Sequence, residues 1–335
     1  SSPEGSAQME MDAPVQRYPT PKEPYLDSLP QLLAMVCIGE HSVLGIVNPN
    51  TWNSNPCVSP KRCLIIEREG VDIPFRVTHP SLPLPSTINL STQYTRVGGE
   101  VYAFGGHSHA YLHIFDIATL RWRTSRPHLA YPGQTLFHNW PQARTRFGAF
   151  CLEGVYVLLG GASKEYNGYG DEGVLSDTWS FDPSTGVWTR CMDTLEPMVF
   201  FEPGGIGIPI AGTAYVNMAN RSGSYFAFTH KDGWCPSSLR TNRGYCSTAY
   251  PWDRFIVYVG PLGDVELLDT VSGERYRQEN IFCRIEGTSC LLEDGTILGR
   301  SAFTVYRASE AFNKWDSQAL LPGWVYPHFS LKWAV

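Results

Sequence analysis

The chain has 335 residues, a net charge of −6 and few charged residues (17%), whereas Trp, Tyr and Phe together make up 13%. A folded chain of this length can bury most of the surface that its unfolded form exposes, so neither disulfides nor a metal are needed to hold it together. The charges form no long acidic or basic block, which argues against nucleic acid as the main partner, and no apolar run approaches the ~18 residues of a transmembrane helix, which argues against membrane insertion.

The first 30 residues contain Pro3, Pro14, Pro19, Pro21, Pro24 and Pro30 among Ser, Glu and Gln, and they show almost no apolar periodicity. This composition predicts a disordered or extended tail over residues 1–30 and a folded domain over residues 31–335. Short apolar runs broken by turn residues then begin. We expect one pair of strands over 32–38 and 43–47, and a second pair over 63–67 and 75–77.

Further along, one pattern occurs twice: an apolar run that ends in Gly-Gly, then an aromatic-Asp pair, then a Trp six positions past the Asp. The first copy comprises Val101 to Gly106, Phe115-Asp116 and Trp122, and the second comprises Val155 to Gly161, Phe181-Asp182 and Trp188. This pattern resembles the kelch repeat, which is the blade unit of a β-propeller. The resemblance implies an all-β, kelch-type propeller.

The glycines of the repeat suggest two kinds of local structure. The Gly-Gly pairs are expected where a strand ends so close to a neighbouring blade that a side chain would crowd it. Gly186 is expected to close a turn at positive φ after Asp182, and Gly273 follows Asp269 at the same spacing in a degenerate copy.

Counting strands and repeats gives six blades, with seven as the alternative. Their expected limits are 31–85, 88–127, 143–195, 208–236, 243–280 and 285–320. The last strand-like run, 328–335, is expected to pair into the first blade and close the ring, which removes an open sheet edge.

One face of such a propeller is the candidate binding surface. In a four-stranded antiparallel blade, the loop between the second and third strands opens on the same face as the link to the next blade, and the family resemblance implies binding there. The link arginines are candidates, and the segment from Pro141 to Gly148 is similar to the opening of a kelch blade. These arginines are Arg144, Arg146, Arg243 and Arg284. Gathered together they would bind an acidic or carboxylate-bearing ligand, and the alternative is that each packs against a neighbouring blade.

Two loops add candidates on this face. The second repeat carries an insertion over 164–172 in which Tyr166 and Tyr169 offer contacts to a protein or peptide, or simply decorate the surface. His107 and His109 follow the first Gly-Gly pair and could share a metal, since residues two apart in an extended chain point the same way. No third ligand is identifiable, so we expect loop histidines, no metal and no cofactor.

Nine cysteines are scattered along the chain. Cys57 and Cys63 lack a Cys-x-x-Cys or His partner, so free or structural thiols are expected rather than zinc. Thiols favour a reducing compartment, cytoplasmic or nuclear. A secreted protein is the alternative, because the sequence begins without Met and has sequons at Asn89 and Asn220.

No catalytic constellation is apparent in the sequence. The favoured interpretation is therefore a non-enzymatic platform that binds a protein or peptide, possibly acidic, as an adaptor, scaffold or subunit of a larger assembly. The alternative is an enzyme or small-molecule binder, for a carbohydrate or acidic metabolite, with its site in the central funnel and using Arg146, Arg243 and Arg284 together with either Glu202 or a histidine.

Overall fold

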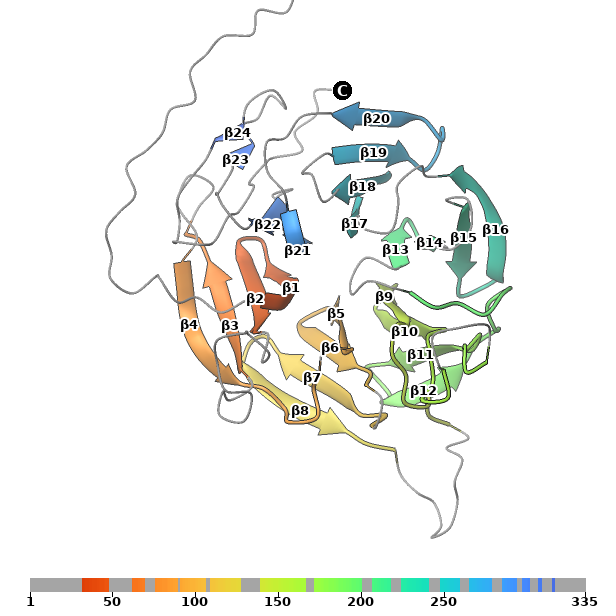
Figure 1. Ribbon diagram of the computed structural model, residues 1–335, viewed down its shortest axis with the longest axis horizontal. Helices are drawn as coiled ribbons and strands as arrows, with labels where there is room; N and C mark the ends of the chain where they lie inside the picture. The colour runs from red at the N-terminus through yellow and green to blue at the C-terminus, as the bar shows by residue number, and fades with distance from the viewer. Residues whose placement is uncertain are drawn as a thin grey trace, which may run out of the picture.

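A computed structural model describes residues 32–47, 62–69, 76–89, 91–106, 109–127, 139–166, 172–200, 207–217, 224–240, 248–259, 265–278, 285–293, 297–301, 307–308 and 315–316. These residues form a β-propeller, in which sheets are arranged like blades around a central axis (Figure 1). No helix in the described part of the chain is long and apolar enough to cross a membrane.

Five four-stranded sheets make up most of the ring, and in each the strands are adjacent in chain order and antiparallel. Blades one to three contain β1 (Leu32–Gly39), β2 (Ser42–Val47), β3 (Arg62–Glu67), β4 (Arg76–Pro83), β5 (Gln93–Val97), β6 (Glu100–Phe104), β7 (Leu112–Asp116), β8 (Arg121–Ser125), β9 (Gly148–Leu152), β10 (Val155–Leu159), β11 (Thr178–Asp182) and β12 (Val187–Arg190). Blades four and five contain β13 (Gly207–Ile210), β14 (Thr213–Asn217), β15 (Ser224–Thr229), β16 (Gly233–Arg240), β17 (Thr248–Trp252), β18 (Phe255–Val259), β19 (Val265–Asp269) and β20 (Arg275–Gln278).

The expectation of six or seven blades is corrected to five four-stranded blades among the described residues. The segment expected to form a sixth contributes a two-stranded sheet of β21 (Ile285–Leu291) and β22 (Ile297–Ser301), and a second one of β23 (Arg307–Ala308) and β24 (Trp315–Asp316). The full repeat, with its Gly-Gly pair, occurs only in blades two and three, so no repeat defines the limits of this segment. The tail over 1–30 and the closing strand over 328–335 lie outside the described residues.

The innermost strands contact each other around the ring. Each of β1, β5, β9, β13 and β17 contacts the next one, and β21 contacts both β17 and β1 (Figure 1). The sheet β21–β22 therefore lies between blade five and blade one.

The core lies between blades rather than within one. Separate clusters of buried apolar side chains fill the contacts from blade one to two, two to three, three to four and four to five. In three successive blades, an aromatic residue of the third strand pairs with a Trp of the fourth: Phe115 with Trp122, Phe181 with Trp188, and Phe228 with Trp234, at ring-centroid distances of 5.1, 5.2 and 4.9 Å. These pairs explain the spacing of the sequence repeat, since they place large rings against the neighbouring blade.

The turns of the repeat have the predicted geometry. In the blade-three turn the Asp182 carbonyl accepts a hydrogen bond from the Gly186 N–H at 2.8 Å, and Gly186 has φ +70°. The degenerate copy is built the same way, with Asp269 and Gly273 joined at 2.9 Å and φ +74° at Gly273. Positive φ is the reason for glycine at this position.

Candidate functional site

The loops of blades two and three are joined on the face where binding was expected. The Gly106 N–H donates to the Arg144 carbonyl at 2.9 Å, so the loop between β6 and β7 is hydrogen-bonded to the link that leads into β9. Thr145 and Ala162 exchange backbone hydrogen bonds of 2.9 and 2.7 Å, which join the same link to the loop between β10 and β11. One backbone network therefore fixes three segments of this face.

The Gly-Gly pairs make this network possible. Gly161 has φ +98°, and a Cβ there would lie 2.5 Å from the Phe147 Cβ and 2.7 Å from the Thr145 carbonyl oxygen. Gly106 has φ +128°, and a Cβ there would lie 2.5 Å from the side-chain nitrogen Nδ2 of Asn89. Side chains at these positions would clash with neighbouring segments, as the sequence suggested.

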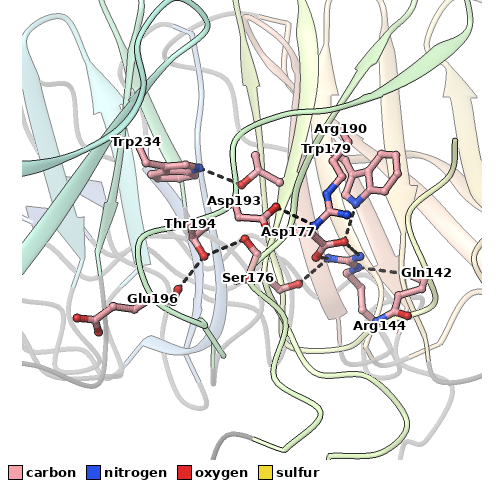
Figure 2. A network of polar contacts seen from close by, with 12 residues as sticks. Gln142, Arg144, Ser176, Asp177, Trp179, Arg190, Asp193, Thr194, Glu196 and Trp234 are labelled. Carbon is pink, nitrogen blue, oxygen red and sulfur yellow. Dashed lines mark hydrogen bonds and ion pairs between the residues drawn. The ribbon is translucent and has the colours of Figure 1, made fainter. Parts of the chain in front are cut away.

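Arg144 is a buried structural residue. It has no exposed surface and forms a two-point ion pair with Asp177, with N–O distances of 2.6 and 2.7 Å (Figure 2). Its remaining hydrogen bonds go to the carbonyl oxygens of Gly160, at 2.9 Å, and Gln142, at 3.2 Å. This is the packing alternative for a link arginine, and it leaves Arg144 out of any ligand-binding surface.

The carboxylate of Asp177 accepts a further hydrogen bond from a tryptophan. The indole N–H of Trp179 donates to Asp177 at 2.6 Å. Burial by itself would raise the pKa of Asp177, but the hydrogen bonds and charge of Arg144 outweigh this effect and lower the pKa below its usual value. Asp177 is therefore charged at neutral pH.

The polar network continues from blade three towards blade four. The Thr194 hydroxyl lies 3.0 Å from the Ser176 carbonyl oxygen and 2.7 Å from that of Glu196. The indole N–H of Trp234, on β16, donates to the Thr178 hydroxyl at 2.9 Å (Figure 2). These bonds fix the segment after β12 and hold the outer strand of blade four against blade three.

Arg146, only two residues after Arg144, is exposed. Its backbone is left-handed, with φ +51°, and its carbonyl accepts a hydrogen bond from the Phe200 N–H at 2.8 Å. Its guanidinium lies 5.9 Å from the ring centroid of Tyr166, which is a cation–π distance. The structure thus brings together two of the predicted site residues, one from the link and one from the insertion.

The root of the insertion is ordered by local bonds. The Ser163 N–H donates to the Gly173 carbonyl at 2.8 Å, so the two ends of the loop meet. The Tyr166 N–H donates to the Ser163 carbonyl at 3.2 Å. Tyr166 is therefore presented next to Arg146 from a closed loop base.

A second group of aromatic and basic side chains lies on the same face at blade two. The ring of His109 stacks on Tyr111 at 5.0 Å and 12°, and the guanidinium of Arg126 lies 5.0 Å from the same tyrosine ring. His109 was predicted, whereas Tyr111 and Arg126 were missed. Their proximity follows from hairpin register, because Leu112 pairs with Ser125 and the next positions outward are Tyr111 and Arg126.

Behind this group lies a buried histidine. His113 is 4% exposed and its two ring nitrogens lie 2.8 Å from the hydroxyls of Thr87 and Thr124. Burial lowers the pKa of His113 to about 4, and the charges of Arg126 and His109 add to the shift. It is a neutral, hydrogen-bonded core residue at physiological pH.

The remaining predicted residues cannot be placed. Arg243, Arg284, Tyr169, His107 and Glu202 lie outside the described residues. The pairing of His107 with His109 and the gathering of all four arginines thus stay predictions. Among the residues that the structure describes, no group of three or more His, Cys, Asp and Glu side chains is arranged to hold a metal ion.

Comparison with known proteins supports the fold. No protein-family model and no curated protein sequence matches this chain. A solved structure described as "Structure of YjhT" matches with a TM-score of 0.59 and 12% sequence identity, over 88% of this chain and 99% of that one. At this identity the likeness concerns the fold alone, and it extends over the whole length of the YjhT chain. The chain therefore has the fold of a β-propeller.

Proposed function

We propose that this chain is a kelch-type propeller that acts as a non-enzymatic binding platform for an acidic protein or peptide, as an adaptor or subunit of a larger assembly. The observation that carries the proposal is the pair of cation–aromatic groups on one face. Arg126 and His109 lie against Tyr111, and Arg146 lies against Tyr166.

Such groups suit peptide recognition. Tyr and Arg are enriched in the energetically dominant parts of protein interfaces, because a flat ring and a planar guanidinium supply large contact areas together with directed hydrogen bonds. Stacking against a tyrosine ring restricts the side chain of Arg126 before binding, which reduces the entropy lost on association. The guanidinium groups would then bind carboxylates of the partner.

The backbone network supports the same proposal. The loops that carry these side chains are tied together by hydrogen bonds such as Gly106 to Arg144 and Phe200 to Arg146, so the face is rigid enough to present a defined surface. A cytoplasmic or nuclear location is part of the proposal. It fits the free thiols of the six described cysteines, Cys37, Cys63, Cys151, Cys191, Cys235 and Cys290.

A peptide array tests the proposal directly. The full chain is applied to immobilised acidic, neutral and basic peptides of matched length, and retention is measured at low and high salt. We expect preferential retention of acidic peptides, weakened by salt. Retention that does not depend on peptide charge would contradict the proposal.

Variants locate the binding surface. Tyr111→Ala combined with Arg126→Ala, and separately Arg146→Ala combined with Tyr166→Ala, should each reduce retention. Arg121→Ala is the matched control, because Arg121 is an exposed arginine at the other end of the same β7–β8 hairpin. Equal losses for Arg121→Ala and for the double variants would show that this face is not the binding surface.

A further inference from the structure

Two thiols meet where the ring closes. Cys37 lies on β1 and Cys290 on β21, strands from opposite ends of the described chain that lie side by side (Figure 1). The two thiol groups are within hydrogen-bonding reach of each other. Cys290 is 4% exposed, whereas Cys37 is only partly buried.

An arginine from a third element lies beside them. A terminal guanidinium nitrogen of Arg96, on β5, lies 3.9 Å from the sulfur of Cys37 and also forms an ion pair with Glu293, just after β21. The Cys37 sulfur lies 3.3 Å from the Gly39 carbonyl oxygen. The first blade, the second blade and the closing sheet thus meet at this thiol pair.

The surroundings make the two thiols unequal. The hydrogen bond from Cys290, aided by the positive charge of Arg96, lowers the pKa of Cys37 to about 7 despite its burial. The same hydrogen bond and burial raise the pKa of Cys290 well above its usual value. Cys37 is therefore the nucleophile of the pair, and Cys290 is the protonated partner held next to it.

We propose that Cys37 and Cys290 form a redox-active dithiol site that reacts with a low-molecular-weight disulfide. Once oxidised, the site is a disulfide cross-link between β1 and β21, where the ring closes. The site is separate from the proposed peptide-binding face and does not depend on it.

The reaction is a pair of thiol–disulfide exchanges. The Cys37 thiolate attacks one sulfur of an oxidised glutathione-type disulfide, forming a mixed disulfide and releasing one thiolate. The Cys290 sulfur, after losing its proton, attacks the sulfur of Cys37, forming the Cys37–Cys290 disulfide and releasing the second thiolate. The two protons lost by the protein thiols end on the two released thiols, and the small disulfide takes up the two electrons.

Cys63 and Cys151 have different surroundings. Burial raises the pKa of Cys63 to about 11, and burial also raises that of Cys151. The sulfur of Cys63 lies 3.8 Å from the Leu82 carbonyl oxygen. Thiols of this kind are poor nucleophiles at neutral pH, so reaction is expected at Cys37 before Cys63 and Cys151.

Oxidation should also stabilise the ring. A disulfide between β1 and β21 would enclose nearly the whole described chain, and the entropic benefit of a cross-link grows with the loop that it closes. We expect the thermal midpoint of unfolding to rise on the order of 5 °C on oxidation and to return after reduction with dithiothreitol.

Peptide mapping of the full chain tests the proposal. Reduced protein is incubated with excess oxidised glutathione near pH 7.5, alkylated with iodoacetamide and digested without reductant. The expected result is a linked peptide that joins Cys37 to Cys290 and forms before other cysteine pairs. The absence of this linked peptide, or glutathione that stays attached to Cys37 in the wild type, would overturn the proposal.

Two variants separate the steps. Cys290→Ser should stop at the glutathione adduct of Cys37 and show no rise in the thermal midpoint, whereas Cys63→Ser, the control for loss of a buried thiol, should still form the linked peptide. A Cys37–Cys290 disulfide that forms without raising the thermal midpoint would contradict the proposal that the cross-link stabilises the ring.

Discussion

The two terminal guanidinium nitrogens of Arg144 each donate a hydrogen bond to one carboxylate oxygen of Asp177. Arg144 has no exposed surface. The pair joins the link that precedes β9 to the residue before β11. Since one charge of a buried pair cannot be removed without leaving the other uncompensated, this contact is a sensitive point of the fold.

The first prediction concerns the stability of that pair. Arg144→Ala should lower the free energy of unfolding by about 3 kcal/mol, because the largely buried carboxylate of Asp177 would lose its partner. Arg190→Ala is the control, since Arg190 forms an exposed ion pair with Asp193 and should cost at most about 1 kcal/mol. Urea unfolding of both variants measures the difference, and equal costs would contradict the structural role of Arg144.

The sequence distinguished the two link arginines poorly, for a physical reason. Arg144 and Arg146 precede the same strand, and nothing local shows which one is buried. The burial of Arg144 depends on Asp177, a partner 33 positions away, whereas the position of Arg146 depends on a left-handed backbone at a non-glycine residue. Neither feature has a sequence signal.

Other features were predictable because they depend on local rules. Gly186 and Gly273 occupy the positive-φ turn position, and the aromatic–Trp pairs define the outer strands. Tyr111 and Arg126 could have been found by extending the pairing of Phe115 with Trp122 along the hairpin. The number of blades was not predictable, since the segment over 285–320 carries no intact repeat and was assigned by spacing alone.

The second prediction follows from the buried histidine. His113 has a pKa of about 4 in the folded protein against 6.5 as the usual value, so the unfolded chain binds an extra proton between these two pH values. The stability is complete above about pH 6.5 and should fall by up to about 3 kcal/mol as the pH drops towards 4.

His113→Gln isolates this effect, because Gln keeps hydrogen-bonding groups for Thr87 and Thr124 but does not titrate. Between pH 6.5 and 4, the free energy of unfolding should fall less in the variant than in the wild type. His79→Gln serves as the control, since His79 is exposed on β4 and does not contribute to the shift at His113. A wild-type and a His113→Gln curve that run parallel over this range would contradict the assignment.

The third prediction concerns the close contact at Gly161. A Cβ there would lie 2.5 Å from the Phe147 Cβ in a backbone with φ +98°, so Gly161→Ala should combine steric overlap with backbone strain and cost about 2–4 kcal/mol. Gly186→Ala has φ +70° but nothing within 4 Å of the added Cβ, so it should cost about 1 kcal/mol from strain alone. Thermal unfolding of the two variants separates the steric overlap with Phe147 from the backbone strain. Equal shifts of the midpoint would mean that the overlap contributes nothing.

The fourth prediction concerns the charge beside Cys37. Arg96→Gln removes the guanidinium that lies 3.9 Å from the sulfur, so the pKa of Cys37 should rise from about 7 towards that of an ordinary thiol. The thiolate fraction at pH 7 should then fall several-fold, and the rate of Cys37 alkylation by iodoacetamide should fall with it. At pH 9.5, where Cys37 is ionised in both proteins, the two rates should converge. Arg121→Gln, which removes an exposed arginine from blade two, should leave the pH profile unchanged. A profile for Arg96→Gln identical to that of the wild type would mean that Arg96 does not set the reactivity of Cys37.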